Sequence, residues 1–334
     1  MMGTGLVQLP DSGGELVRTR PLCFGLTVTS IEELAGLLDR HARPDLSTAI
    51  DGVRICKIDR TTAPSTSMSG TVVAMIAQGG KRLALGERMY EYTTGQYLVA
   101  PIDLPVTGHV MNASPDSPTL GFGMTLEPST IAELLLNAGP GGVPRVSSAT
   151  GPGIVVGDVT RELLDAIVRL VRLLDTPADR RALTPLVKRE ILWRLMTGPH
   201  GVVVRQLGLA DSSLNHVTHA VQWIRDNYQQ PFRVEDLAQL TGMSVSAFHR
   251  NFQAVTAMSP IQFQKHIRLH TARLMLVNQP HDVTGVGHRV GYTSVSQFSR
   301  EYRRQFGAPP SLDALRLHRD GEAAAEGTVV AALP

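Results

Sequence analysis

The sequence has few of the residues from which disulfide frameworks, zinc sites and membrane spans are built. Its 334 residues include 2 cysteines, Cys23 and Cys56, whose separation offers neither a disulfide framework nor a zinc-ligand motif. No apolar run approaches the roughly 20 residues that a membrane-spanning helix needs. No basic segment followed by an apolar one opens the sequence, as it would in a secretory signal. We therefore expect a cytoplasmic protein with no membrane partner.

Catalytic motifs are scarce as well. The sequence contains no nucleophile elbow, phosphate loop or dinucleotide fingerprint. Between residues 45 and 150 the only histidine is His109, whereas a metal-dependent barrel enzyme needs two or three with a carboxylate. His266 and His270 have the spacing of two ligands on one helix face, but no third ligand lies at a telling distance, so we interpret them as a solvated face. We expect no enzyme, no bound metal and no cofactor.

A seven-residue signature, Ser-Val-Ser-x-Phe-x-Arg, occurs twice in the chain, at Ser244–Arg250 and at Ser294–Arg300. Flanking residues recur with nearly the same offset, so that Phe252 is matched by Tyr302. Such a repeat indicates one small structural unit that is used twice.

Each copy has the pattern of two short helices joined by a tight turn. In the first copy, Val234–Leu240 has helical spacing of apolar residues, and Gly242 suits the left-handed conformation that ends a helix. Ser244 then caps a second helix, in which Phe248 and Phe252 face inward at positions i and i+4. This is the helix-turn-helix arrangement, whose second helix can enter the major groove of DNA.

The second copy and the connecting segment support this interpretation. Val283–Val290 precedes Gly291, and Phe298 and Tyr302 face inward in the helix that follows. Between the copies, a helix is predicted from Pro260 to about Asn278, with a length of roughly 27 Å. Because adjacent major-groove segments lie about 34 Å apart, such a helix could hold two recognition helices in successive grooves.

Six motifs at fixed spacings run through the C-terminal third of the chain. They are Val234-Glu-Asp-Leu-Ala238, Phe248-x-Arg250-x-Phe252, Arg268-Leu269-x-x-Ala272, Val290-Gly-Tyr-x-Ser294, Gln297-Phe-Ser-Arg300 and Phe306-Gly-Ala-Pro309. Together they make the stretch from about His216 to Arg316 resemble the DNA-binding domain of AraC/XylS-type transcription regulators. Two departures are Ala257, where the family usually has Gly, and Gly287, where it usually has Ala. A glycine inside a helix costs about 1 kcal/mol, so the second unit is expected to be the less stable one.

The resemblance implies which side chains read bases. They are Ser246, His249 and Arg250 in the first unit and Ser296, Gln297, Ser299 and Arg300 in the second. The alternative is that Arg250 and Arg300 contact only phosphates or form ion pairs within the domain. Residues 213–320 contain 12 Lys and Arg against 7 Asp and Glu, a positive surplus that fits a double-stranded DNA partner.

The N-terminal half has a different pattern, of short apolar segments broken by Gly, Pro and Asn, which is typical of an all-β sandwich or barrel. Predicted strands are Val53–Ile58, Thr71–Ala77, Arg82–Leu85, Met89–Thr93, Gln96–Ala100, Val106–Met111 and Leu120–Leu126. Gly79 and Gly80 are predicted to form a hairpin turn between two of them. Ser65 and Ser67 are assigned to a loop, and Ser129 is expected to cap a helix at Ile131–Leu136.

The motifs Gln78-Gly-Gly-Lys81, Tyr90-x-Tyr92, Gly95-Gln-Tyr-Leu98 and Asp103-Leu-Pro105 make this region resemble the cupin-like sensor domain of a subset of AraC-type regulators. The resemblance implies sensing of a small molecule but does not name the effector. Tyr90, Tyr92 and Tyr97 either line an effector pocket or pack inside the barrel. Cys56 is either a reactive sensor thiol or, as we favour, a buried small residue.

Two strongly helical segments follow, at Thr160–Leu174 and at Leu183–Met196, with Pro185 expected in the first turn of the second. They either pack against the barrel or form a homodimer interface. The segment from Gly198 to Ser213 is predicted to be a hinge.

The expected fold is therefore α+β with two domains. Its parts are a partly disordered extension at 1–45, a cupin-like β-barrel at 46–150, a helical connector at 151–212, an all-α double helix-turn-helix domain at 213–320 and a disordered tail at 321–334. The expected function is effector-controlled regulation of transcription, with RNA polymerase as a further partner if the protein activates. Two alternatives remain open: a barrel that binds a partner protein, and an enzyme fused to a DNA-binding domain.

Overall fold

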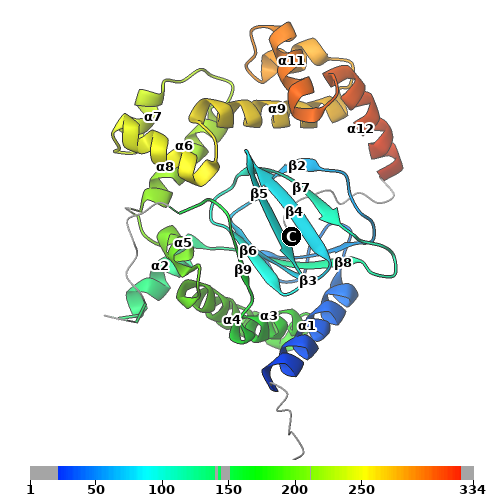
Figure 1. The fold of residues 1–334 in the computed structure, drawn as a ribbon, viewed down its shortest axis with the longest axis vertical. Helices are drawn as coiled ribbons and strands as arrows, with labels where there is room; N and C mark the ends of the chain where they lie inside the picture. The colour runs from blue at the N-terminus through cyan, green and yellow to red at the C-terminus, as the bar shows by residue number, and fades with distance from the viewer. Residues whose placement is uncertain (1–21, 140–141, 144–150, 211, 325–334) are drawn as a thin grey trace, which may run out of the picture.

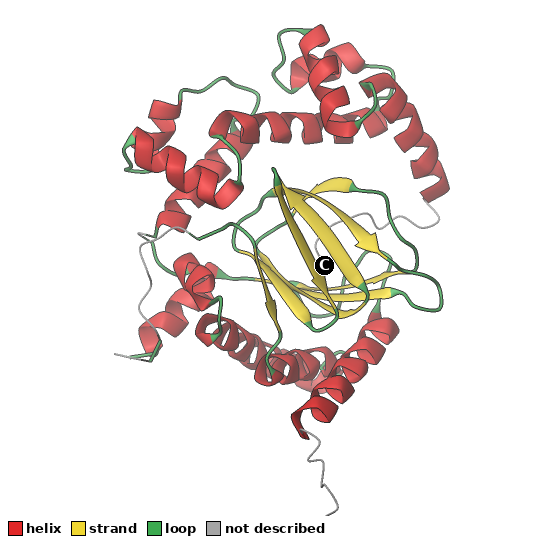
Figure 2. Cartoon of the chain, in the orientation of Figure 1, coloured by secondary structure: helices red, strands yellow, loops and turns green. Residues whose placement is uncertain are grey.

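The computed structural model describes residues 22–139, 142–143, 151–210 and 212–324. Two antiparallel sheets enclose a barrel at the centre of the molecule, with helices around it (Figures 1 and 2). The first sheet has the order β1-β8-β3-β6-β9 and the second the order β2-β7-β4-β5. The strands are β1 Val53–Ile58, β2 Ser65–Met68, β3 Val72–Gln78, β4 Gly80–Leu85, β5 Arg88–Thr93, β6 Gln96–Ala100, β7 Pro105–Met111, β8 Thr119–Thr125 and β9 Val155–Asp158.

The prediction of a hairpin turn at Gly79–Gly80 is wrong. Strand β3 belongs to the first sheet and β4 to the second, so the chain crosses between sheets at this point. Gly79 has a φ of +86°, and a Cβ atom there would lie 2.3 Å from Oγ1 of Thr119. The two glycines therefore form a crowded corner of the barrel, and β4 makes its hairpin with β5 instead.

Two strands were not expected from the sequence. Ser65 and Ser67 lie in β2, which pairs with β7 along Ser65–Met68, so their assignment to a loop is wrong. Val155–Asp158, inside the stretch assigned to the helical connector, forms β9 and extends the first sheet beside β6. Both strands have 4 residues, and so short a segment carries too little periodicity to be recognised locally.

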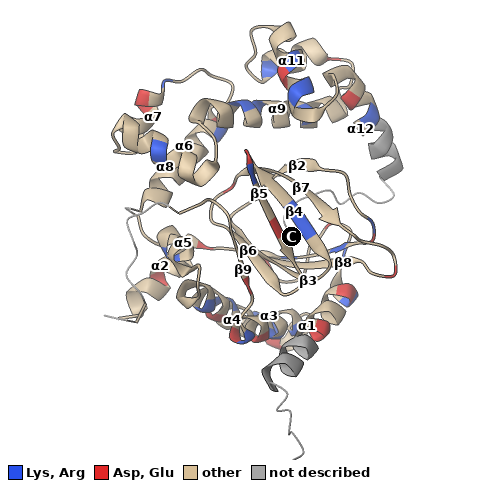
Figure 3. Ribbon diagram, viewed as in Figure 1, with Lys and Arg blue, Asp and Glu red and all other residues tan. Residues whose placement is uncertain are grey.

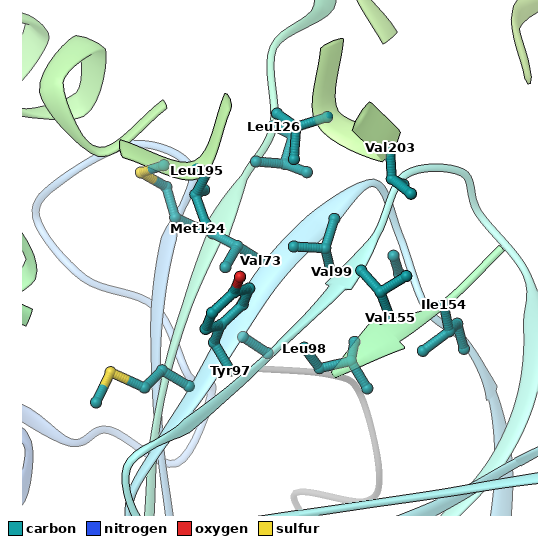
Figure 4. Packing of buried hydrophobic residues seen from close by; sticks show 14 of the residues in the cluster. Val73, Tyr97, Leu98, Val99, Met124, Leu126, Ile154, Val155, Leu195 and Val203 are labelled. Carbon is teal, nitrogen blue, oxygen red and sulfur yellow. The ribbon is translucent and has the colours of Figure 1, made fainter. Parts of the chain in front are cut away.

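Five helices accompany the barrel: α1 Leu22–His41, α2 Pro128–Asn137, α3 Arg161–Arg172, α4 Pro177–Thr197 and α5 Gly201–Leu207. Helices α1, α3 and α4 pack side by side against the outer face of the first sheet. In Figure 4, Leu195 of α4 and Val203 of α5 lie over Val73 and Val99 of the sheet. The inner strands β3 and β8 are therefore buried along nearly their whole length and are mostly apolar, whereas β1 at the edge keeps Arg54 and Lys57 exposed.

Several helix boundaries differ from the predictions. Ser129 lies inside α2, which begins at Pro128 after Glu127. Pro185 lies in the middle of α4, because this helix already begins at Pro177. The predicted hinge contains α5, whose residues Val203 and Val204 are buried, so packing holds this segment in place. Helix α1 occupies residues 22–41 of the predicted extension, whereas residues 1–21 lie outside the described part.

The C-terminal domain consists of α6 Ser213–Asp226, α7 Val234–Leu240, α8 Val245–Thr256, α9 Pro260–Asn278, α10 Val283–Arg289, α11 Val295–Phe306 and α12 Pro310–Ala324. Helix α9 runs across the top of the molecule in Figure 1 and joins the two helical units. Phe263 and Ile267 of α9 belong to the hydrophobic core that also fills the barrel, while Leu269 and Leu276 belong to a second, separate core. Among the described helices, none is long and apolar enough to cross a membrane.

Candidate nucleic-acid interface

The first helix-turn-helix unit is formed by α7 and α8. Gly242 ends α7 with a φ of +66°, and the Ser244 side chain caps α8 by accepting a hydrogen bond from the Ala247 amide. Phe248 and Phe252 are fully buried, as predicted, and fix the inner face of α8. The outer face is left to polar side chains, and the three predicted base-reading residues lie there exposed: Ser246, His249 and Arg250.

The second unit, α10 and α11, repeats this geometry. Gly291 has a φ of +90°, Ser294 caps α11, and Phe298 and Tyr302 are fully buried. Of the four predicted base-reading residues, three are exposed and one is half-buried: Ser296, Gln297 and Arg300 are exposed, and Ser299 is half-buried. The Gln297 side chain donates to Oε1 of Glu301 at 3.4 Å, so it must leave this partner to contact a base.

Arg250 and Arg300 occupy equivalent positions on the two recognition helices. Within the part of the chain that the structure describes, neither guanidinium forms an ion pair or a hydrogen bond with the protein. This disfavours the alternative that the two arginines serve as ion pairs inside the domain. Both remain available for phosphate or for the O6 and N7 acceptors of guanine.

Helix α9 fixes the distance between the two units. It contains 19 residues and therefore spans roughly 28 Å, and its N-terminus is held by a reciprocal capping box between Ser259 and Gln262. Arg268 on α9 donates from Nε to the Tyr228 carbonyl at 2.6 Å, which ties α9 to the segment before α7. The predicted helix from Pro260 to Asn278 is confirmed at both ends.

On the second unit, Asp313 of α12 joins three helices. Its Oδ2 accepts from Nε of Arg273 on α9 at 2.9 Å and from the Tyr302 hydroxyl on α11 at 2.8 Å. Burial and the adjacent Asp313 carboxylate raise the pKa of the Tyr302 hydroxyl, which keeps its proton as a donor. A buried charge that is paired and hydrogen-bonded in this way holds α11 in one orientation on α9.

Sequence reasoning missed two further cations on the second recognition helix. Arg303 and Arg304 are exposed and follow Arg300 at the i+3 and i+4 positions, so the three side chains lie on neighbouring parts of one helix surface. The equivalent positions of the first unit are Gln253 and Ala254. The second recognition helix is therefore the more basic one, and Figure 3 shows this concentration of Lys and Arg on α11. The spacing of the three arginines was the signal available in the sequence.

The first unit and the helix before it, α6, also contact the barrel. Arg88 at the start of β5 donates to the Ala254 carbonyl in the last turn of α8 at 3.0 Å, and Arg225 of α6 pairs with Asp103 of the β6–β7 loop. A Cβ atom on Gly153 would overlap the Val255 carbonyl, so the segment before β9 packs directly on α8. No comparable bond joins α10 or α11 to the barrel within the described residues.

His266 and His270 on α9 are half-buried, so the interpretation of a solvated face is wrong. Burial lowers the pKa of both imidazoles.

Cys56 in the barrel is buried, as the favoured interpretation predicted, and burial raises the pKa of its thiol. Tyr92 is fully buried in the barrel, and its hydroxyl has no described hydrogen-bond partner. Among the described residues, no three His, Cys, Asp or Glu side chains form a group that could hold a metal.

Both halves of the chain match known protein families. Residues 49–203 match the family described as AraC-type transcriptional regulator N-terminus, and residues 237–312 match a family described as a helix-turn-helix domain. The two matches cover the barrel with its helices and the two units on α9. The chain belongs to the AraC family of transcription regulators.

Among the relatives of this AraC-family chain is the HTH-type transcriptional activator RhaS of Salmonella paratyphi B, which is 25% identical over 155 residues. The matched stretch covers 46% of this chain and 54% of RhaS, so the chain spans about half the length of the curated relatives it matches.

Solved structures share the fold at low sequence identity. An apo lysine-to-alanine variant of ToxT from Vibrio cholerae superposes with a TM-score of 0.51 and 10% identity, covering 81% of this chain and all of that one. Wild-type ToxT bound to an unsaturated fatty acid gives a TM-score of 0.49 at 12% identity, covering 79% of this chain and 94% of that one. The α+β architecture, with a sheet domain followed by a helical helix-turn-helix domain, is therefore a fold already seen in the solved structure of ToxT.

Proposed function

We propose that this protein regulates transcription by binding specific double-stranded promoter DNA through both helix-turn-helix units. The observation that carries the proposal is the equivalent placement of Arg250 and Arg300. They stand 50 positions apart in the sequence and occupy matching sites on α8 and α11, and a single helix, α9, joins the two units. Ser246 and His249 in the first unit, and Ser296, Gln297 and Ser299 in the second, complete the proposed base-reading surfaces.

Control by a small-molecule effector in the N-terminal domain is the second part of the proposal. In the described structure the barrel is joined to the first unit by the Arg88–Ala254 contact and to the preceding helix α6 by the Arg225–Asp103 pair, and β7 also packs against α9. The first unit can be docked on the barrel or released from it, and an effector that binds one of these states more tightly would shift the balance between them. It would thereby change the fraction of molecules whose two units can take up the spacing of the operator. The barrel thus acts as a sensor, and catalysis plays no part in the proposal.

Other partners follow from the same proposal. Leu183 and Leu186 remain exposed on α4, with 41% and 62% of their surface accessible, and this supports a homodimer through that helix. Two copies would place two DNA modules on paired half-sites. The protein would act in the cytoplasm, and RNA polymerase would be a further partner if it activates.

The experiment compares binding to DNA from around the protein's own gene with binding to unrelated DNA at the same salt concentration. Arg250→Ala and Arg300→Ala should each cost about 1–3 kcal/mol on the specific DNA and less on the unrelated DNA. Arg181→Ala, which removes an exposed arginine from α4, serves as the matched control and should leave both affinities unchanged. Equal affinity for the two DNAs, unaltered by either substitution, would refute base reading by these arginines.

A further inference from the structure

A groove of about 730 Å³ lies between α1 and the edge of the barrel. One wall is the α1 face that carries Ile31, Glu32 and Gly36, and the other comes from β1, β3 and the loop before β8. In Figure 1 these elements lie at the end of the barrel opposite α9, so the groove is separate from the DNA-binding surface. Its volume falls within the range of roughly 300–1,000 Å³ that small-molecule sites occupy.

The α1 wall is held firmly against the rest of the domain. Leu34, Leu37 and Leu38 are buried on its inner side, and Glu33 accepts a hydrogen bond from Nε of Arg172 on α3 at 2.7 Å. The backbone of the α1 wall is thus held in place by the packing of the domain.

Gly36 is one of the residues that line the groove, and it adds no side chain to it. No described atom lies within 4 Å of the position that a Cβ would take at this residue, so packing does not require a glycine there. Glycine inside a helix is nevertheless unfavourable by about 1 kcal/mol relative to alanine. An open, glycine-floored cavity with apolar side chains from Ile31, Ala77 and Leu120 is suited to receive the apolar body of a ligand.

The charges that line the groove are unbalanced. Three carboxylates, those of Glu32, Asp39 and Asp116, face one ammonium group, that of Lys57. Nζ of Lys57 lies 2.6 Å from Oδ1 of Asp39, so these two groups compensate each other. Within the described residues, Glu32 and Asp116 form no ion pair with the protein. Two carboxylates on opposite walls of the groove therefore remain to attract positive charge.

We propose that this groove binds a small organic cation with an apolar body. Glu32 and Asp116 would contact the cationic group, while Ile31, Ala77 and Leu120 contact the body of the ligand. The further statement that this cation is the effector rests on the proposed function; the binding itself does not, because the groove lies far from the DNA-binding surface.

The test uses three probes of the same shape and different charge: tryptamine as the cation, tryptophol as the neutral analogue and indole-3-propionate as the anion. Calorimetric titration of the full chain should show binding of tryptamine at millimolar concentration or below, at least about tenfold tighter than tryptophol, and no binding of the anion. Binding of tryptamine should weaken as the salt concentration rises, because it depends on partly exposed charges.

Variants locate the site. Glu32→Gln and Asp116→Asn should each reduce tryptamine affinity several-fold, and Gly36→Leu should abolish it by filling the groove. Glu162→Gln, which removes an exposed carboxylate from α3, is the matched control and should change nothing. The proposal fails if all three probes bind equally, if none binds at millimolar concentration, or if the control weakens binding as much as Glu32→Gln. DNA binding, measured on the same samples, tests the proposed function separately, since neither result determines the other.

Discussion

The guanidinium of Arg88 donates to the Ala254 carbonyl at 3.0 Å and so joins the barrel to the last turn of the first recognition helix. Carbonyls at the end of a helix lack partners within the helix and carry partial negative charge, which makes them good acceptors for a cation. The contact therefore satisfies an otherwise free backbone group of α8 while anchoring this unit to the sensor domain.

Removing that contact should release the first unit. Arg88→Ala is expected to raise affinity for the specific DNA by about fivefold, corresponding to roughly 1 kcal/mol, because undocking no longer costs this hydrogen bond. Amide hydrogen exchange in the last turn of α8 should become faster as well. Arg82→Ala is the matched control, since Arg82 pairs with Glu91 within the barrel. Unchanged DNA affinity and exchange in Arg88→Ala would show that the contact does not restrain the unit.

The two turn glycines of the repeat should differ in their tolerance of alanine. Gly242 and Gly291 both have positive φ, but a Cβ on Gly242 meets no described atom within 4 Å, whereas one on Gly291 would lie 2.3 Å from the Gln229 carbonyl oxygen. Gly242→Ala should therefore cost about 1 kcal/mol of unfolding free energy from backbone strain alone. Gly291→Ala should cost about 3 kcal/mol or more, because the overlap adds to that strain. Urea denaturation of both variants measures the difference, and equal losses would contradict the crowding at Gly291.

Acidification should loosen the contact between α9 and the barrel. Burial lowers the pKa of His270, whose Nε2 has no described hydrogen-bond partner; nearby Arg273 acts in the same direction, whereas Asp103 and the backbone of Thr66 oppose it. In the unfolded chain the imidazole takes up its proton near pH 6.5, so the stabilisation is complete above that pH and is lost as the pH falls through the lowered folded value.

His270→Gln should consequently reduce the fall in unfolding free energy between about pH 7.5 and pH 5. Replacement of the exposed His281 by Gln is the control and should keep the wild-type slope. If His270→Gln and wild type lose stability in parallel over this range, the buried imidazole does not contribute to the pH dependence.

The Cys56 thiol should react slowly in the folded protein. It is 3% exposed, and burial raises its pKa, so little thiolate is available for attack. In a Cys23→Ala background, alkylation by iodoacetamide should accelerate strongly only at urea concentrations that unfold the barrel. A cysteine placed at the exposed Ser129 of a cysteine-free variant should react rapidly without denaturant. Rapid modification of Cys56 in the native protein would revive the hypothesis of a sensor thiol.

The C-terminal domain could be predicted from the sequence because its determinants are local. Caps such as Ser244 and Ser259, turn glycines such as Gly242, and apolar spacing at i and i+4 all act within a few residues of one another. The predicted helix across residues 260–278 consequently has the bounds of α9. The exposed arginines Arg250 and Arg300 followed from the same spacing, although their contact with DNA stays a prediction.

The barrel was predicted less completely because strand pairing is decided by distant residues. Seven strands were recognised from their apolar runs, yet nothing near Gly79 reveals that Thr119, 40 residues later, crowds it into a corner between sheets. The polar β2 is a strand only because β7 pairs with it, and within the predicted hinge α5 is held in place by its buried residues. The docking contacts and the groove beside α1 likewise join segments that lie far apart in sequence.

Because α9 contributes residues to both hydrophobic cores, its length sets the distance and the rotation between the two helix-turn-helix units. One residue inserted near His266 would turn the second unit by about 100° relative to the first and point its recognition helix away from the groove. Seven inserted residues would restore the direction and add roughly 10.5 Å, the rise of about three base pairs. Under the proposed function, the residue count of a single helix would thus set the spacing between the two halves of the operator.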